Sequence, residues 1–240
     1  SSFNYLYAVS SYNDGSGATI NDTISNFHLR KYASTPPSTS LASEEIGPGP
    51  AAHGKFDEGG GSTANDSAGN NTGTITGATW ASEDQCVSGK CLSFDGTDDY
   101  VEVPTSSSLS LPTAFALAAW IKPESNNTRL VLGKASSYKM YLTSGGLSLY
   151  NGSVGNWAFQ NVGNVPLNEW DHVVSVYDGT TVKAYVNGEE AYSASYSTSF
   201  GTPTSILKIG QDPNGTGQSF SGQIDDVRIY NYALSPAQIQ

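Results

Sequence analysis

Charged residues make up only 14% of this 240-residue chain, which holds one Met, two Cys and three His. A C-x₂-C zinc site needs two more thiolates or histidines nearby, but His28, His53 and His172 are scattered, which disfavours structural zinc. No apolar run is long enough to span a bilayer, and no signal peptide is visible. We therefore expect no membrane insertion, and a mature or trimmed form of a secreted protein.

The sequence also lacks the short motifs of the common enzyme classes. G-x-S-x-G, G-x-G-x-x-G, the P-loop and H-E-x-x-H are all absent. The adjacent carboxylate pairs Glu44-Glu45, Glu83-Asp84 and Glu189-Glu190 point to opposite faces of any strand, so neither member can assist the other in acid/base chemistry. The sequence predicts a non-catalytic protein.

Acidic residues outnumber basic ones by 22 to 11, which gives a net charge of −11. This balance argues against nucleic acid as a partner, because nucleic acid is a polyanion. It suits the binding of a cation such as Ca²⁺, or it simply keeps a surface protein soluble. The residues in abundance are 26 Gly and 14 Tyr, with 8 Phe and 4 Trp, a composition typical of extracellular β proteins.

From residue 51 onward the pattern predicts successive β-strands joined by tight turns. Residues 115–121 are almost continuously apolar, which indicates a strand buried on both faces. Asp178-Gly179 and Asn187-Gly188 separate alternating segments and predict two tight hairpins. Further predicted strands cover residues 54–58, 74–80, 129–134, 138–143, 147–151, 170–177, 182–186, 190–194, 205–210 and 220–230.

The segment Cys91–Val103, C-L-S-F-D-G-T-D-D-Y-V-E-V, predicts a strand, an acidic turn and a second strand. Asp95-Gly96 between two alternating apolar runs indicates a β-hairpin. The carboxylates of Asp95, Asp98 and Asp99 fit either a metal cluster or ordinary turn chemistry, and turn chemistry is the favoured interpretation.

Three segments in this order resemble the LamG-like jelly-roll domains of the concanavalin A-like lectin/glucanase superfamily. They are Cys91–Val103, F-A-L-A-A-W-I-K-P at 115–123, and F-S-G-Q-I-D-D-V-R-I-Y at 220–230. The resemblance implies an all-β fold, an antiparallel β-sandwich of jelly-roll topology, for a domain spanning 47–240. It does not select a function, because this sandwich occurs in lectins, adhesins and structural repeats alike. Glucanases of this fold carry an E-x-D-x-x-E or E-x-D-x-E strand, which is absent here.

Residues 1–46 are predicted to form an N-terminal β-strand extension and linker. Phe3–Val9 and Ile24–Tyr32 have strand-like patterns, and the prolines after them mark a linker. Part of this segment resembles the closing strand of a domain of unknown function that precedes LamG-like jelly rolls in archaeal and bacterial surface proteins. Two strands cannot bury both faces alone. They would add to the following domain, pair with a neighbouring chain by strand donation, or be disordered or truncated.

The resemblance also implies a structural calcium ion. The loop N-D-S-A-G-N-N at 65–71 resembles the family's D-S-S-G-N loop, which points to Asp66 and Asn70 as ligands. Asp225 is the expected distant ligand, and Asp57 is a further candidate. The alternative is that Asp66 makes an Asx turn and Asp225 only accepts backbone N–H bonds.

The alternation of side chains along a strand predicts whether Asp225 points into the core or toward solvent. It alternates with Val227 and Ile229, so its carboxylate is predicted to point into the core. A carboxylate there needs a metal, an arginine or backbone donors.

Sugar binding is a separate hypothesis. Lectin sites of this fold stack loop aromatics on sugar rings and bond hydroxyls with Asp or Asn. Tyr150, Asn151 and Trp157 stand near turns and are the candidate ligand-binding residues. The alternative is that they are ordinary solvent-facing strand residues.

Cysteines and sequons bear on the compartment. Cys86 and Cys91 are predicted to form a local disulfide, with free thiols as the alternative, and a disulfide implies an oxidising compartment. Asn-x-Ser/Thr glycosylation candidates begin at Asn21, Asn65, Asn70, Asn126, Asn151 and Asn214.

Together these patterns predict a non-catalytic, calcium-stabilised adhesive module on an archaeal or bacterial cell surface, with a glycan or a surface protein as its ligand. The alternative is a structural subunit of a filament or surface layer that self-associates through residues 1–46. A glycan-active enzyme is the least supported hypothesis.

Overall fold

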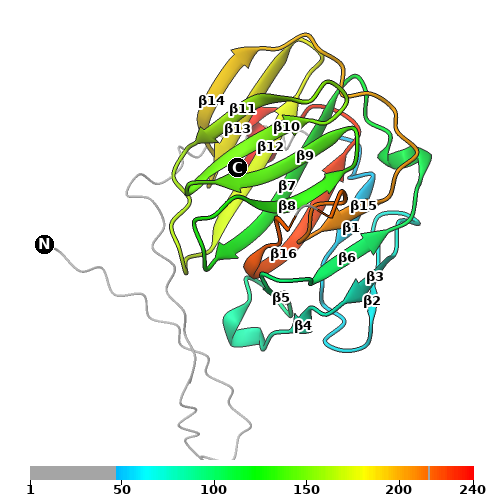
Figure 1. Ribbon diagram of the computed structural model, residues 1–240, viewed down its shortest axis with the longest axis vertical. Helices are drawn as coiled ribbons and strands as arrows, with labels where there is room; N and C mark the ends of the chain where they lie inside the picture. Colours follow the sequence, from blue (N-terminus) through cyan, green and yellow to red (C-terminus); the bar gives the residue numbers. More distant parts are fainter. Residues whose placement is uncertain (1–46, 216) are drawn as a thin grey trace, which may run out of the picture. The chain divides into compact units, whose positions relative to one another are not determined.

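The computed structural model describes residues 47–215 and 217–240. This part of the chain forms two antiparallel sheets and one short α-helix, which confirms the predicted all-β jelly-roll sandwich. In Figure 1 the strands β8, β9 and β10 of one sheet lie in front of β7 and β12 of the other. The predicted N-terminal extension, residues 1–46, lies outside the described residues. Within the described residues, no helix combines the length and hydropathy needed to cross a bilayer.

The first sheet, sheet A, has the order β14-β13-β12-β7-β16-β5-β4, and β1 pairs with β16 at one side. Its strands are β1 (Ala52–Gly54), β4 (Thr79–Trp80), β5 (Leu92–Asp95), β7 (Phe115–Pro123), β12 (Asp171–Tyr177), β13 (Thr181–Val186), β14 (Glu189–Ser195) and β16 (Ser221–Tyr230).

The second sheet, sheet B, has the order β11-β10-β9-β8-β15-β6-β3-β2. Its strands are β2 (Thr63–Ala64), β3 (Gly73–Thr76), β6 (Tyr100–Val103), β8 (Arg129–Lys134), β9 (Tyr138–Thr143), β10 (Gly146–Asn151), β11 (Asn156–Val162) and β15 (Leu207–Ile209).

The central strand β7 is buried on both faces, as its continuous apolar run predicts. Its odd-numbered residues, such as Leu117 and Ile121, join the main core between the sheets. Ala116 and Ala118 face the other way and pack with Leu234 and Ile239 near the C-terminus. Ile239 belongs to the only α-helix of the described residues, α1 (Pro236–Ile239), so this helix closes part of the outer face of sheet A.

The predicted hairpin at Cys91–Val103 is wrong, because its two strands belong to different sheets. Strand β5 pairs with β4 and β16 in sheet A, whereas β6 pairs with β3 and β15 in sheet B. Gly96, at φ +82°, makes the turn, and the Asp95 amide donates to the Asp99 carboxylate over 2.8 Å. The Asp99 carboxylate thus caps the turn, and the turn directs the chain across the sandwich.

A second corner lies beside the first. The strand predicted at 74–80 is two strands, β3 in sheet B and β4 in sheet A, separated by Gly77 at φ +77°. A Cβ at Gly77 would lie 1.9 Å from Oδ1 of Asp99. The two sheet-crossing turns are thus in direct contact, and glycine is required where they meet.

Asp225 does not face the core, because a β-bulge interrupts its strand. The register of β16 against β7 shifts between Asp225 and Arg228, and Asp226 has φ +47°. Ile224 and Val227 both belong to the core, so two residues between them point outward. Asp225 pairs with Trp120, on the face of sheet A opposite the core.

The disulfide between Cys86 and Cys91 is present, with Cα atoms 5.5 Å apart. The loop that it closes lies over the outward-facing Asp225. The amides of Val87 and Ser88 donate to Oδ2 of that carboxylate, over 3.2 and 3.4 Å. Asp225 is therefore 1% exposed although it is not in the core.

Candidate functional site

A pocket of about 270 Å³ opens on the face of sheet B that points away from the core. Strands β9, β10 and β11 form its floor, and the segment after β15 forms one wall. Its lining combines aromatic rings with polar groups, and comprises Lys139, Tyr141, Tyr150, Trp157, Asp212, Asn214 and Gln218.

Strand alternation explains why these side chains share one face. Along β9, Met140 and Leu142 enter the core, so Lys139 and Tyr141 point to the opposite side. Tyr150 of β10 is the direct cross-strand partner of Lys139 and of Trp157 on β11. Three neighbouring strands therefore present these residues side by side.

The charged centre of the pocket is an ion pair between Lys139 and Asp212. The ammonium nitrogen lies 3.0 and 3.1 Å from the two carboxylate oxygens, and the side chains are 3% and 2% exposed. The Tyr141 hydroxyl also donates to Asp212, and the Asn214 amide donates over 2.7 Å. Burial acts to raise the pKa of Asp212, but these donors outweigh it and hold the pKa below its ordinary value. Asp212 is thus ionised at neutral pH.

Gly133 on β8 gives the Lys139 side chain its path to Asp212. The two residues are cross-strand partners. A Cβ at Gly133 would lie 2.9 Å from Cγ and 3.0 Å from Cα of Lys139. A larger residue at this position would therefore push the lysine out of its place beside the carboxylate.

The aromatic part of the pocket consists of three mutually inclined rings. Trp157 makes edge-to-face contacts with Tyr141 and Tyr150, at centroid distances of 5.5 and 5.0 Å. The Lys139 ammonium lies 5.9 Å from the centre of the Tyr150 ring. The rings are half-buried at Tyr150 and Trp157, so their remaining surface is open to a ligand.

The structure brings Tyr150 and Trp157 together but does not bring Asn151 to the pocket. Asn151 is fully buried and points the other way, where its amide donates to the Tyr196 hydroxyl and the Ser199 carbonyl, each over 3.0 Å. It anchors the segment after β14 rather than lining the pocket.

Sequence reasoning missed Lys139, Tyr141 and Asp212. A signal did exist on β9, where a lysine alternates with core residues in an apolar strand, which is unusual unless the lysine has a partner. No pattern linked it to Asp212, because the pair is separated by 73 positions.

Two of the four predicted calcium ligands, Asp66 and Asn70, stand in the loop of residues 65–71. Asp66 accepts four hydrogen bonds, from the amides of His53, Ala68 and Asn71 and from the Asn71 side chain. Burial acts to raise its pKa, but these bonds outweigh it and the pKa is lowered. Its carboxylate therefore stabilises the loop as an Asx turn does.

Asp57 and Asp225 both bond the loop that the disulfide closes. Asp57 accepts the Lys90 amide over 3.1 Å, and Asp225 accepts amides of the disulfide loop. Asn70 is exposed. Among the described residues, the three predicted carboxylates do not form a metal-ligating group.

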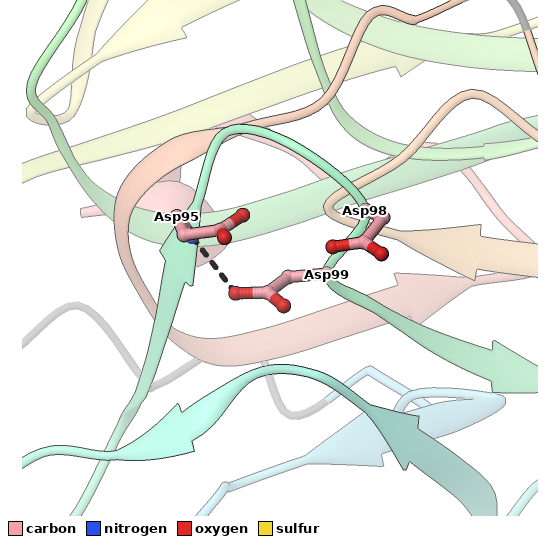
Figure 2. A group of neighbouring side chains, drawn as sticks. All are labelled: Asp95, Asp98 and Asp99. Atoms are coloured by element: carbon pink, nitrogen blue, oxygen red, sulfur yellow. Dashed lines mark hydrogen bonds between the residues drawn. The ribbon is translucent and has the colours of Figure 1, made fainter.

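The one group of three carboxylates in the described part of the chain is Asp95, Asp98 and Asp99, at the turn between β5 and β6 (Figure 2). Their nearest ligand oxygens lie within 4.8 Å of one another. Burial raises the pKa of Asp99, and the charges of Asp95 and Asp98 add to this. Asp95 and Asp99 each also accept an amide within the turn, from Thr97 and Asp95.

Burial separates the glycosylation candidates. Asn65, Asn70, Asn126 and Asn214 are exposed, whereas Asn151 is 0% exposed and bonded through both ends of its amide; Asn21 lies outside the described residues. In a glycosylating secretory host we expect Asn151 to stay unmodified in the folded protein. Peptide mapping by mass spectrometry checks this, with the exposed sites as internal controls. A glycan at Asn151 in soluble, cooperatively melting protein would contradict it.

Asp225 gives the protein a specific pH dependence. Burial raises its pKa to about 7, against the lowering effect of the amides that bond it. A carboxyl with a raised folded-state pKa contributes most stability when protonated, so its contribution falls as pH rises from about 4 through about 7. Each pKa unit corresponds to about 1.4 kcal/mol, or a few degrees in Tm.

The measurement is the Tm of wild type and Asp225→Asn at pH 4.5 and 8. We expect the difference, variant minus wild type, to be larger at pH 8, because Asn carries no charge to bury. Burial lowers the pKa of His172 to about 4, so its contribution to stability rises with pH. Because His172 is present in both proteins, this contribution cancels in the difference. Parallel pH profiles for the two proteins would disprove the prediction.

These features define a class: a jelly-roll β-sandwich with a polar, aromatic-lined surface pocket on one sheet. Residues 95–240, more than half of the chain, match the family described as the concanavalin A-like lectin/glucanases superfamily. The chain belongs to this superfamily.

The proteins similar to this chain include curated sequence relatives and solved structures. Usherin of Rattus norvegicus is 29% identical over 152 residues, which is 57% of this chain and 3% of usherin. The chain thus spans a very small part of the curated relatives it matches.

Solved structures match over more of their length. Domain 4 of AbnA, a GH43 extracellular arabinanase from Geobacillus stearothermophilus solved in complex with arabinotriose, is similar at 26% identity with a TM-score of 0.64. The match covers 80% of this chain and 96% of that one. The binding domain of Paraclostridial Mosquitocidal Protein 1 is similar at 15% identity and a TM-score of 0.62, over 80% and 51% of the two chains. The second likeness shows the fold alone.

Proposed function

We propose that this chain is a non-catalytic, extracellular adhesive module that binds a glycan in the pocket of sheet B. The observation behind the proposal is the lining itself, in which half-buried Tyr150 and Trp157 stand beside hydrogen-bonding groups fixed by a buried ion pair. Ligand sites in proteins combine apolar surface with a few placed polar groups in this way. The similarity to an arabinanase domain solved with arabinotriose supports a sugar ligand.

A binding role suits the pocket better than hydrolysis. Glycosidases use two carboxyl groups on either side of the bond that is cleaved. Asp212 is the only carboxylate among the residues that line this pocket, and its four hydrogen bonds leave it no proton to give. The disulfide at Cys86 and Cys91 supports an extracellular location.

The test is glycan-array screening followed by titration calorimetry on the best neutral hit, with arabinotriose as the first probe. Trp157→Ala is expected to weaken binding at least tenfold, which corresponds to about 1.4 kcal/mol. Trp170→Ala is the matched control, because Trp170 is also half-buried but its indole bonds to Gln85 away from the pocket. A blank array, or equal effects of the two substitutions, would remove the sugar-binding proposal.

Calcium stabilisation remains part of the proposal, with Asp95, Asp98 and Asp99 as the candidate ligands, because they form the one group of three carboxylates in the described residues. A cation there would relieve the repulsion that contributes to the raised pKa of Asp99. Addition of Ca²⁺ to protein treated with EDTA is expected to raise Tm by several degrees, and Asp98→Asn to abolish the response. Asp178→Asn, at another exposed turn, should leave it intact. An unchanged Tm in the wild type would end the calcium claim.

A further inference from the structure

We infer that the pocket of sheet B selects an uncharged sugar of one or two units, and that Lys139 rather than Asp212 is the charged residue that contacts it. This inference rests on the proposed glycan-binding function and specifies the ligand of that site.

The Asp212 carboxylate has no capacity left for a ligand. A carboxylate offers about four acceptor positions. Oδ1 accepts from Lys139 and from the Asn214 amide, and Oδ2 accepts from Lys139 and from the Tyr141 hydroxyl. A sugar hydroxyl would have to displace one of these donors. Asp212 is therefore a positioning residue that fixes Lys139 and Tyr141.

Lys139 keeps one donor for a ligand. An ammonium group has three N–H donors, and two of them go to the oxygens of Asp212. The third has no hydrogen-bond partner among the described residues, and the nitrogen lies over the face of the Tyr150 ring, which lines the pocket. A hydroxyl or ring oxygen of a sugar stacked there would accept this N–H. The Tyr141 oxygen, which donates its own proton to Asp212, can in turn accept from a second hydroxyl.

The electrostatics favour a neutral ligand. Lys139 and Asp212 cancel each other, so the pocket has no net charge to offer a carboxylate. An acidic sugar would place its charge beside the ionised Asp212 in a protein of net charge −11. It would lose its water and gain no unpaired cation in return.

The dimensions favour a short ligand. The pocket volume of about 270 Å³ lies just under the roughly 300–1,000 Å³ that holds drug-sized molecules. Trp157 stands edge-to-face against Tyr141 and Tyr150, so the three rings do not form a flat platform for a long chain. Affinity is therefore expected to stop rising beyond two sugar units.

The experiment is calorimetric titration of the whole chain with matched neutral and acidic probes: galactobiose and arabinotriose against digalacturonate and N-acetylneuraminic acid. We expect the neutral probes to bind at least tenfold more tightly. Lys139→Met should weaken them about tenfold, while Lys183→Met should leave them unchanged. Lys183 is a suitable control because it pairs with Glu190 over 2.8 Å on the other sheet.

Asp212→Asn gives the sharper readout. It leaves the Lys139 charge uncompensated, so selectivity should reverse toward the acidic probes by about tenfold or more. If Asp212→Asn fails to fold, Lys139→Met/Asp212→Asn, which removes both charges, should still melt cooperatively and bind neither class well.

Acidic probes that bind wild type as tightly as neutral ones, or an Asp212→Asn protein with unchanged selectivity, would overturn the inference and leave glycan binding standing. A wild type that binds no probe and no array glycan overturns both.

Discussion

Asp212→Ala is expected to lower the free energy of unfolding by about 3–5 kcal/mol, the largest single effect that we foresee. Removing one member of a buried ion pair leaves the other charge without compensation, and Lys139 is 3% exposed. The Tyr141 hydroxyl and the Asn214 amide lose their acceptor in the same step. At about 2–4 °C per kcal/mol for a domain of this size, Tm should fall by roughly 10 °C.

Urea denaturation checks this value against Glu190→Ala, which removes the carboxylate of an ion pair at 32% and 42% exposure. That exposed pair should contribute no more than about 1 kcal/mol. The double variant Lys139→Met/Asp212→Leu should recover most of the loss, because it removes both charges and fills the space with apolar atoms. A loss in Asp212→Ala no larger than in Glu190→Ala would show that the pair is hydrated and not buried.

Gly210→Ala is expected to cost about 2–5 kcal/mol. Gly210 has φ +86°, and a Cβ there would lie 2.4 Å from the Phe94 ring. Phe94 is 2% exposed and packs edge-to-face on Phe220, so it has little freedom to move aside. The conformational penalty of about 1–2 kcal/mol is thus joined by about 1–3 kcal/mol of overpacking.

Gly215→Ala separates the conformational penalty from the cost of overpacking. Gly215 has φ +71°, but a Cβ there meets no heavy atom within 4 Å. It should show the conformational penalty alone. Phe94→Leu combined with Gly210→Ala should show favourable coupling, because the smaller side chain makes room for the methyl group. Equal losses in Gly210→Ala and Gly215→Ala would contradict the packing argument.

The sequence predicted individual strands well wherever local pattern determines them. The bounds predicted for 129–134 and 138–143 are those observed for β8 and β9. The apolar run at 115–121 became the doubly buried centre of sheet A, because such a run has no polar side to leave exposed.

The sequence did not predict how strands are assigned to sheets. The Asp95-Gly96 turn is compatible with a hairpin and with a corner, and only the partners of β5 and β6 distinguish them. The bulge at Asp226 places Asp225 on the outer face of sheet A instead of the core face. A single residue in the left-handed conformation cannot be recognised from the hydrophobic pattern of the sequence.

The candidate site was predicted in part. Tyr150 and Trp157 are conspicuous in sequence as aromatics near turns, and the structure places both at the pocket. The ion pair beside them joins strand β9 to a segment beyond β15, and such long-range pairing cannot be inferred from spacing.

The two outer faces of this sandwich also differ in a way that matters for handling the protein. The outer face of sheet A is covered in part by α1 and by the disulfide loop, whereas that of sheet B carries the open pocket. Lys183 lies on sheet A with its side chain half-exposed, and Lys139 is buried. Coupling to a sensor chip through Lys183 alone should hold the molecule by sheet A and leave its pocket facing the solution.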